Sequence, residues 1–174
     1  MMMAMLEAGG IEIVTDALRR PDEDNPQGYY ELERVKSLPT DPDHGWLASA
    51  EGKAIKIISS LLKHLSPAFS YDVIFMNRDL DEVIVSQRKM LIRRGEEMAE
   101  QDERQMKLFF QRHLEKVKTW LSAQSNFRLI EVAYKEVLES PLEQGTRLEN
   151  LLGRSLRTDQ MVKTVDRRLY RNRG

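Results

Sequence analysis

The chain has 174 residues, of which 41% are hydrophobic and 32% charged, a balance typical of globular rather than disordered proteins. Its 27 basic and 28 acidic side chains give a formal charge of -1, so no overall electrostatic field attracts nucleic acid or a membrane surface. Cysteine is absent, which excludes disulfides, thiolate metal sites and a cysteine nucleophile.

Length and hydropathy predict a single domain over residues 1–174, large enough to bury a core. No apolar stretch approaches the roughly 20 residues of a membrane-spanning helix, and the apolar start of the chain is too short for a signal peptide. We therefore expect a soluble cytoplasmic protein that has no membrane or nucleic-acid partner and no metal cofactor.

The first third of the chain predicts short elements joined by loops. Residues 1–10 are strong helix formers followed by glycine, as at the end of a helix. The helix breakers in residues 19–28 indicate a loop. The other expected elements are a strand over 11–14, a short helix over 29–37, a loop over 38–44, a strand over 53–58 and a brief helical piece from Ser59 that ends before Pro67.

The segment Val73–Ser86 carries the strongest signal in the chain. Four apolar residues, 73–76, stop at Arg78, and this pattern predicts a buried parallel strand over residues 71–77. Arg78 then stands at the carboxyl end of a central strand, which is where open α/β sheets bind their ligands. A guanidinium at this place is suited to hold a phosphate through two hydrogen bonds.

A helix is expected directly after this strand, running to about residue 94 and stopped by Gly95. Asp79 is placed to cap it, with Asp81 and Glu82 in the first turn, where the helix dipole favours carboxylates. A plainer interpretation of Arg78 and Asp79 is an ion pair that only caps the helix.

The longest periodic segment predicts a helix over about residues 99–123. Its apolar side chains recur at spacings of three and four, which indicates one buried face. On this pattern we expect Phe109, Phe110, His113 and Trp120 to pack in the core.

The rest of the chain predicts a strand over 127–134, a loop or helical turn from Tyr134, a helix over 143–152 ending at Gly153, and one more short helix after Ser155. Strands that alternate with helices predict an α/β fold, a parallel sheet flanked by helices and joined by right-handed crossovers.

Several segments, taken in order, resemble the sulfotransferase family, in particular its shorter bacterial members. They are Met5–Gly10, Asp24–Glu31, Lys53–Lys56, Val73–Ser86 and Leu169–Arg171, and they extend over nearly the whole chain. The resemblance implies a P-loop-NTPase-like fold. It also implies transfer of a sulfuryl group from the co-substrate 3′-phosphoadenosine 5′-phosphosulfate to a hydroxyl or amine of a small acceptor.

The resemblance also implies three cofactor-binding residues. In the family, an arginine at the strand end and a serine on the next helix bind the 3′-phosphate, and these positions match Arg78 and Ser86. A tyrosine that begins a Tyr-x-Glu segment after a later strand contacts the adenine, and Tyr134 matches it.

Two departures from the family pattern limit what the resemblance implies. The family's Gly-rich loop, which holds the 5′-phosphosulfate between the first strand and the first helix, has no counterpart, and the chain begins inside the region of that helix. Without these donors we expect a truncated sheet that lacks its first strand and has little or no transfer activity. The segment Lys56–Ser60 also contains no histidine where many members place the general base, so the catalytic residues stay unknown.

Two other classes of function stay open. One is a non-catalytic nucleotide-binding or assembly module that pairs through the exposed sheet edge, with a second copy as one partner. The other is a nucleic-acid binder that uses the terminal arginines, and the near-neutral charge counts against it.

Overall fold

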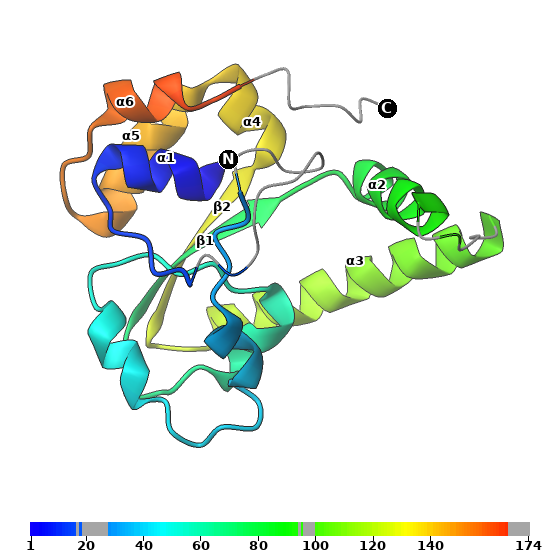
Figure 1. Ribbon diagram of the computed structural model, residues 1–174, viewed down its shortest axis with the longest axis horizontal. Helices are drawn as coiled ribbons and strands as arrows, with labels where there is room; N and C mark the ends of the chain where they lie inside the picture. The colour runs from blue at the N-terminus through cyan, green and yellow to red at the C-terminus, as the bar shows by residue number, and fades with distance from the viewer. Residues whose placement is uncertain (17, 19–27, 94, 96–99, 167–174) are drawn as a thin grey trace.

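The computed structural model describes residues 1–16, 18, 28–93, 95 and 100–166, and it has a mixed α/β architecture (Figure 1). Its elements in chain order are α1 Met2–Gly9, the 3-10 helices η1 Glu33–Ser37, η2 Gly45–Ala50 and η3 Ser59–His64, β1 Tyr71–Asn77, α2 Leu80–Arg93, α3 Glu100–Ser122, β2 Phe127–Ala133, α4 Tyr134–Glu139, α5 Pro141–Leu152 and α6 Thr158–Lys163.

The two named strands form one small parallel sheet. Pairing runs without interruption from Tyr71 opposite Phe127 to Asn77 opposite Ala133. Parallel neighbours need a long crossover, which α2 and α3 supply (Figure 1). The strand predicted over 71–77 and the parallel arrangement are confirmed, and the strand predicted over 127–134 is confirmed except that Tyr134 begins α4.

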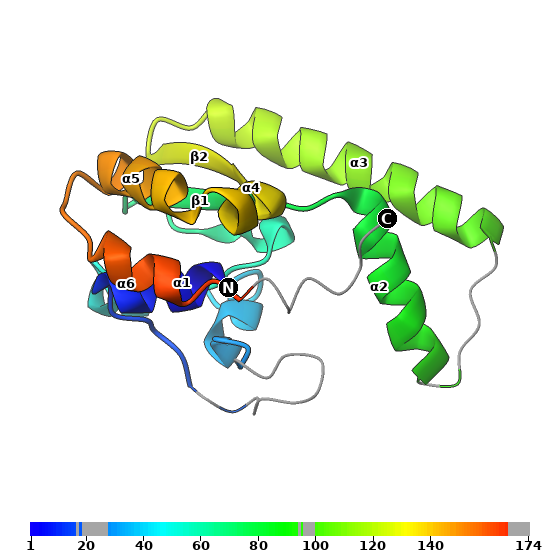
Figure 2. The same ribbon diagram turned by 90° about the horizontal axis from the view of Figure 1, so that it is seen from above.

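The sheet separates two hydrophobic clusters, because successive side chains of a strand point to opposite faces. Ile74 and Met76 pack against the cluster that joins α1, α5 and α6. Val73 and Phe75 belong to the cluster made with the 3-10 helices and the last turns of α3. Helices α1 and α6 lie side by side in both ribbon views (Figure 2). The apolar run of β1 therefore contributes side chains to a hydrophobic cluster on each face of the sheet.

The strands predicted over 11–14 and 53–58 do not form. The two segments pair through one isolated parallel bridge, between Ile13 and Ala54. Backbone bonds from Val14 to Ala54 and from Ala54 to Glu12, both 2.9 Å, hold this bridge. Gly52, with φ of 71°, turns the chain just before it. Ile55 and Ile57 then pack against the core without entering the ladder.

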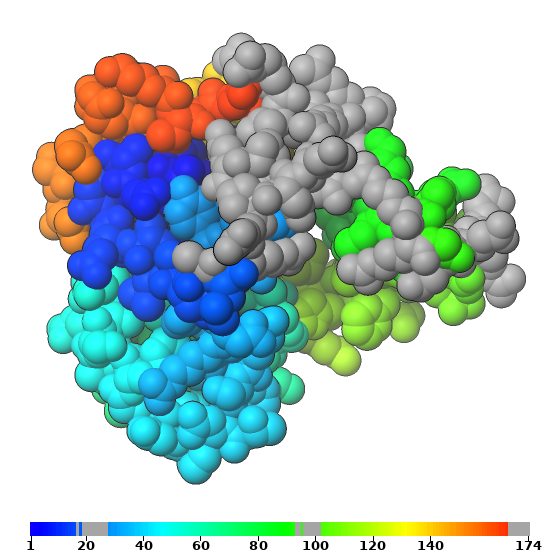
Figure 3. Space-filling view, viewed as in Figure 1, coloured from blue at the N-terminus to red at the C-terminus, as the bar shows by residue number. Residues whose placement is uncertain are grey.

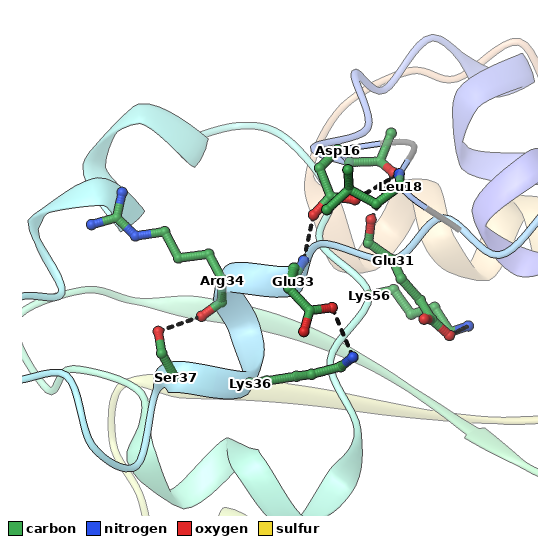
Figure 4. Close-up of polar contacts among 9 residues, drawn as sticks. Asp16, Leu18, Glu31, Glu33, Arg34, Lys36, Ser37 and Lys56 are labelled. Carbon is green, nitrogen blue, oxygen red and sulfur yellow. Dashed lines mark hydrogen bonds and ion pairs between the residues drawn. The ribbon is translucent and has the colours of Figure 1, made fainter. Parts of the chain in front are cut away.

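The helix predicted over 29–37 forms only over Glu33–Ser37, as a 3-10 helix, and Asp16 ties its start to the N-terminal segment (Figure 4). The N–H groups of Glu33 and Leu18 donate to the Asp16 carboxylate at 2.5 and 3.1 Å. These two bonds lower the pKa of Asp16. Leu32, just before Glu33, is extended, and Thr15 and Asp16 donate to the backbone carbonyl of Glu31.

Helix α2 and the adjoining part of α3 project away from the rest of the molecule (Figures 1 and 2). In the space-filling view, α1 touches α6, and α2 stands well apart from both (Figure 3). Arg88 on α2 and Glu103 on α3 form an ion pair at 3.3 Å that links the two helices. None of the described helices is long and apolar enough to cross a lipid bilayer.

The apolar stripe of α3 is a core stripe only in its C-terminal part. Leu121 is buried and Trp120 packs beside it. Phe109, which we expected in the core, is 66% exposed. The prediction that the whole stripe is buried is therefore wrong for Phe109.

Candidate functional site

The parallel register brings Arg78 and Tyr134 together at the carboxyl end of the sheet. Asn77 and Ala133 are the last paired residues of the two strands, and Arg78 and Tyr134 directly follow them. The guanidinium carbon of Arg78 lies 5.2 Å from the centroid of the Tyr134 ring. This distance is within the range of a cation–π interaction. Two of the three predicted binding residues are thus neighbours.

A carboxylate also holds the guanidinium of Arg78. Its Nε donates to Oε2 of Glu82 at 3.3 Å, four residues later on α2. The side chain of Arg78 is 34% exposed and that of Glu82 only 11%. Arg78 therefore does not extend into bulk solvent, and its charge is partly balanced.

The Tyr134 hydroxyl stays protonated in this environment. Burial of the ring raises the pKa of the phenol, the nearby Arg78 cation lowers it, and the Glu82 carboxylate raises it further. The net direction is upward. A neutral phenol keeps its O–H as a donor, and its ring makes the cation–π contact with Arg78.

The turn after Arg78 is fixed by the predicted helix cap. Oδ1 of Asp79 accepts from the N–H groups of Asp81 and Glu82, at 2.7 and 3.4 Å. Asp81 and Glu82 occupy the first turn of α2, as expected from the helix dipole. The cap sets the direction in which α2 leaves the sheet, and this brings Glu82 to Arg78.

Ser86, the third predicted binding residue, is half-buried on α2. It lies four residues after Glu82, and residues at this spacing share a helix face. It is not among the residues that line the cavity beside Arg78. Its predicted contact with a phosphate stays a prediction.

An open cavity of about 500 Å³ lies beside Arg78, between η3, the end of β1 and α3. Its polar lining includes a pair that the sequence did not reveal, Ser59 and His113, with Oγ and Nε2 2.9 Å apart. His113 was expected to pack in the core. It is half-buried and faces this cavity instead, with the Phe109 ring nearly parallel to its own at 11°.

Other residues considered as part of the site lie elsewhere. The described part of the segment 24–31 contacts Lys56, which donates to the carbonyl of Tyr29 at 2.9 Å and lies 3.7 Å from Glu31 (Figure 4). Residues 24–27 and the terminal arginines lie outside the described residues. His44, near the carbonyl of Leu38, does not line the cavity.

A second open cavity, of about 720 Å³, lies between α1 and the end of α6. In its wall the Tyr30 hydroxyl donates to Glu7 at 2.9 Å. Burial, followed by this bond, raises the pKa of Tyr30. Within the described ranges, no group of three or more histidine, aspartate or glutamate side chains could hold a metal ion.

Comparisons of the sequence with protein-family models, with curated proteins and with solved structures found no match.

Proposed function

We propose that the chain binds a 3′-phosphorylated adenine nucleotide at the carboxyl ends of β1 and β2 and belongs functionally with the sulfotransferases. In this proposal the co-substrate is 3′-phosphoadenosine 5′-phosphosulfate and the acceptor is a small molecule with a hydroxyl or amine. The P-loop-NTPase-like fold of that family is part of the same proposal. The observation that carries it is the contact between Arg78 and Tyr134 at the ends of paired parallel strands.

The way Arg78 is held supports a role in phosphate binding. Its Nε bonds Glu82, so the outer edge of the guanidinium, with its two terminal nitrogens, is the edge that a phosphate would meet. Fixing the guanidinium in advance reduces the side-chain entropy lost on binding. Tyr134 fits an adenine contact because an aromatic ring is a sequence-tolerant stacking surface for a base.

The same geometry fits a structural ion pair, and the two roles differ in their consequences. As a structural ion pair near the surface, the contact would stabilise the protein by at most about 1 kcal/mol. A guanidinium that bonds a phosphate contributes about 1.5 to 3 kcal/mol of binding free energy per hydrogen bond. The two roles are therefore separated by measuring binding and stability on the same variants.

The test is calorimetric titration with 3′-phosphoadenosine 5′-phosphate and with adenosine 5′-phosphate, which lacks the 3′-phosphate. We expect Arg78→Met to weaken binding of the first nucleotide at least tenfold and to change binding of the second little. Arg88→Met is the matched control, because Arg88 is likewise an arginine paired with a glutamate, Glu103, but does not line the cavity.

Equal affinities of the wild type and Arg78→Met for the 3′-phosphorylated nucleotide would refute the proposal. Equal losses of nucleotide affinity in Arg78→Met and Arg88→Met would indicate a general effect of removing a positive charge. A wild type that binds neither nucleotide but forms dimers would favour the assembly module.

A further inference from the structure

The open cavity of about 720 Å³ between α1 and the end of α6 is distinct from the Arg78 cavity, and the two share none of their described lining residues. Ala4, Glu7 and Ala8 form its α1 wall. Glu7 and Ala8 follow Ala4 by three and four residues, so the three side chains lie on one face of the helix. The short alanine side chains leave room beside the Glu7 carboxylate, and the volume lies within the range of sites that bind small molecules.

Tyr30 adds to this wall a phenol that is bonded to the carboxylate of Glu7. Its hydroxyl donates to Oε2 of Glu7 at 2.9 Å. Burial, followed by this bond, raises the pKa of Tyr30, so the phenol stays neutral and its proton points to Glu7. Within the described residues no lysine or arginine pairs with Glu7. Its second carboxylate oxygen is therefore open to a donor.

The backbone around Tyr30 is fixed in a strained conformation that supports this contact. The φ of Tyr30 is 51°, in the left-handed region that residues other than glycine rarely adopt. On one side, the carbonyl of Tyr29 accepts from Lys56 at 2.9 Å, and on the other, the carbonyl of Glu31 accepts from Thr15 at 2.7 Å. Strained residues persist where the surrounding structure holds them, and they cluster at sites that bind ligands. The pair of Tyr30 and Glu7 is therefore preorganised.

The hydroxyl groups of the cavity wall offer acceptors rather than donors. Thr164 uses its proton in a bond to the carbonyl of Met161 at 2.7 Å, as Tyr30 uses its own toward Glu7. Both hydroxyl oxygens keep lone pairs that accept, and the carboxylate only accepts. A primary ammonium group supplies three N–H donors and a positive charge, which strengthens each bond to a carboxylate. An anionic ligand would instead be repelled by Glu7.

The rest of the described wall favours an apolar ligand body. Ala4, Ala8 and Val165 are half-buried and apolar, and carbon atoms placed against them are removed from water. Lys163 is the one lysine or arginine among the described lining residues, and it is exposed, so salt screens its repulsion of an ammonium group. Asp166 also lines the cavity but has an interaction of its own and is not part of the contact.

We propose that this cavity binds a primary amine with a small apolar body, an alkylamine or an arylalkylamine. Its ammonium group donates to the second oxygen of Glu7 and to the phenol oxygen of Tyr30, and its carbon atoms lie against Ala4, Ala8 and Val165. This is a binding site apart from the Arg78 cavity, and it has no part in the proposed sulfuryl transfer.

The experiment is calorimetric titration of the chain with phenethylamine at neutral pH, without nucleotide. The neutral 2-phenylethanol and the anionic 3-phenylpropionate have the same apolar body and test the need for the ammonium group. Because Glu7 is exposed, we expect phenethylamine to bind only about five- to tenfold more tightly than either. Equal binding of phenethylamine and 2-phenylethanol, or no binding of phenethylamine, would overturn the proposal.

Two variants and a matched control locate the ligand on α1. Glu7→Gln keeps the shape and an acceptor for Tyr30 but removes the charge, and Ala8→Leu fills the space beside it. Each should weaken phenethylamine binding at least threefold. Glu12→Gln should leave binding unchanged, because Glu12 is paired with Lys53 and does not line the cavity. Urea denaturation checks that each variant is folded, and if Ala8→Leu is not, Glu7→Gln decides. Unchanged binding in Glu7→Gln, or an equal loss in Glu12→Gln, would overturn the proposal.

One more variant and the nucleotide titration keep this proposal separate from the proposed function. Phe109 lines the Arg78 cavity only, so Phe109→Ala should leave phenethylamine binding unchanged. A loss there with none in Glu7→Gln would place the amine in the Arg78 cavity and overturn the assignment. If the chain binds phenethylamine but not 3′-phosphoadenosine 5′-phosphate, the amine site stands and the proposed sulfotransferase function fails. The opposite result removes only the amine site.

Discussion

The guanidinium of Arg78 lies over the ring of Tyr134, with 5.2 Å from its central carbon to the ring centroid. The α2–α3 crossover separates the two residues in the sequence, so only the pairing of β1 with β2 brings them together. A slip of one residue in a strand turns its side chains to the opposite face. The contact therefore depends directly on the register of the sheet.

The carboxylate of Glu82 should compete with a bound phosphate for the guanidinium of Arg78. We expect Glu82→Gln to bind 3′-phosphoadenosine 5′-phosphate more tightly than the wild type, by about two- to fivefold, because the amide does not neutralise the cation. Isothermal titration at low and at high salt measures this gain, which salt should reduce. If Arg78 serves only as a helix ion pair, Glu82→Gln brings no gain in affinity.

The ring of Tyr134, rather than its hydroxyl, should carry the adenine contact. We expect Tyr134→Phe to keep nucleotide affinity within about twofold and Tyr134→Leu to lose about fivefold or more, since stacking of a base contributes about 1 to 3 kcal/mol. Both affinities are measured by calorimetry. A loss in Tyr134→Phe as large as that in Tyr134→Leu would assign the contact to the hydroxyl instead.

Local signals predicted the elements that depend on neighbouring residues. The apolar run before Arg78 became β1, Asp79 caps α2, and Gly10 and Gly153 end their helices with positive φ, 98° and 62°. Each of these features depends on side-chain chemistry and backbone freedom within a few residues. Sequence patterns report such features well.

Features that depend on distant contacts could not be predicted in the same way. The alternation in residues 53–58 indicates a strand, but within the described part of the chain no neighbouring segment extends the ladder beyond the bridge at Ala54. Ser59 and His113 lie on different elements, and their side chains are in contact. No local sequence pattern at either residue points to the other. The only signal was a histidine on an apolar helix face, which more often marks a buried core residue.

The cap of α2 should stabilise the fold measurably. Asp79→Ala removes the acceptor for two N–H groups of the first turn, and we expect a loss of about 1 kcal/mol in the free energy of unfolding. Asp79→Asn is the control, because asparagine is an equally good N-cap. Urea denaturation compares the three proteins. Equal midpoints for all three would mean that the cap contributes nothing.

The close contact between α1 and α6 should make Gly9 intolerant of a side chain. A Cβ at Gly9 would lie 2.9 Å from Sδ of Met161, which is fully buried. We expect Gly9→Ala to destabilise the protein by about 1 to 3 kcal/mol through overpacking. In a Met161→Ala background the added methyl group has room, so the cost should fall by about 1 kcal/mol. Urea denaturation measures the stability of both single variants and of the double variant. If the losses of stability from Gly9→Ala and Met161→Ala simply add in the double variant, the result would argue against this contact.

Glu131 should make the stability depend on pH. Lys118 donates to its carboxylate at 2.6 Å and Asn77 at 2.7 Å, and these bonds, in that order, lower the pKa of Glu131. A carboxyl whose pKa is lower in the folded state adds stability above its unfolded pKa of about 4.3 and loses it as the pH falls through the folded value. Because the side chain of Glu131 is 46% exposed, solvent screening keeps the effect below about 1 kcal/mol.

The matched variant is Glu131→Gln, which keeps the shape of the side chain but cannot ionise. At about pH 7 the wild type should be the more stable of the two. The difference should shrink as the pH falls below the unfolded pKa of about 4.3 and disappear once Glu131 is protonated in the folded state as well. Added salt should reduce the difference at neutral pH, since part of it is the attraction to Lys118. A difference that stays constant across this pH range would mean that the charge of Glu131 contributes nothing to folding.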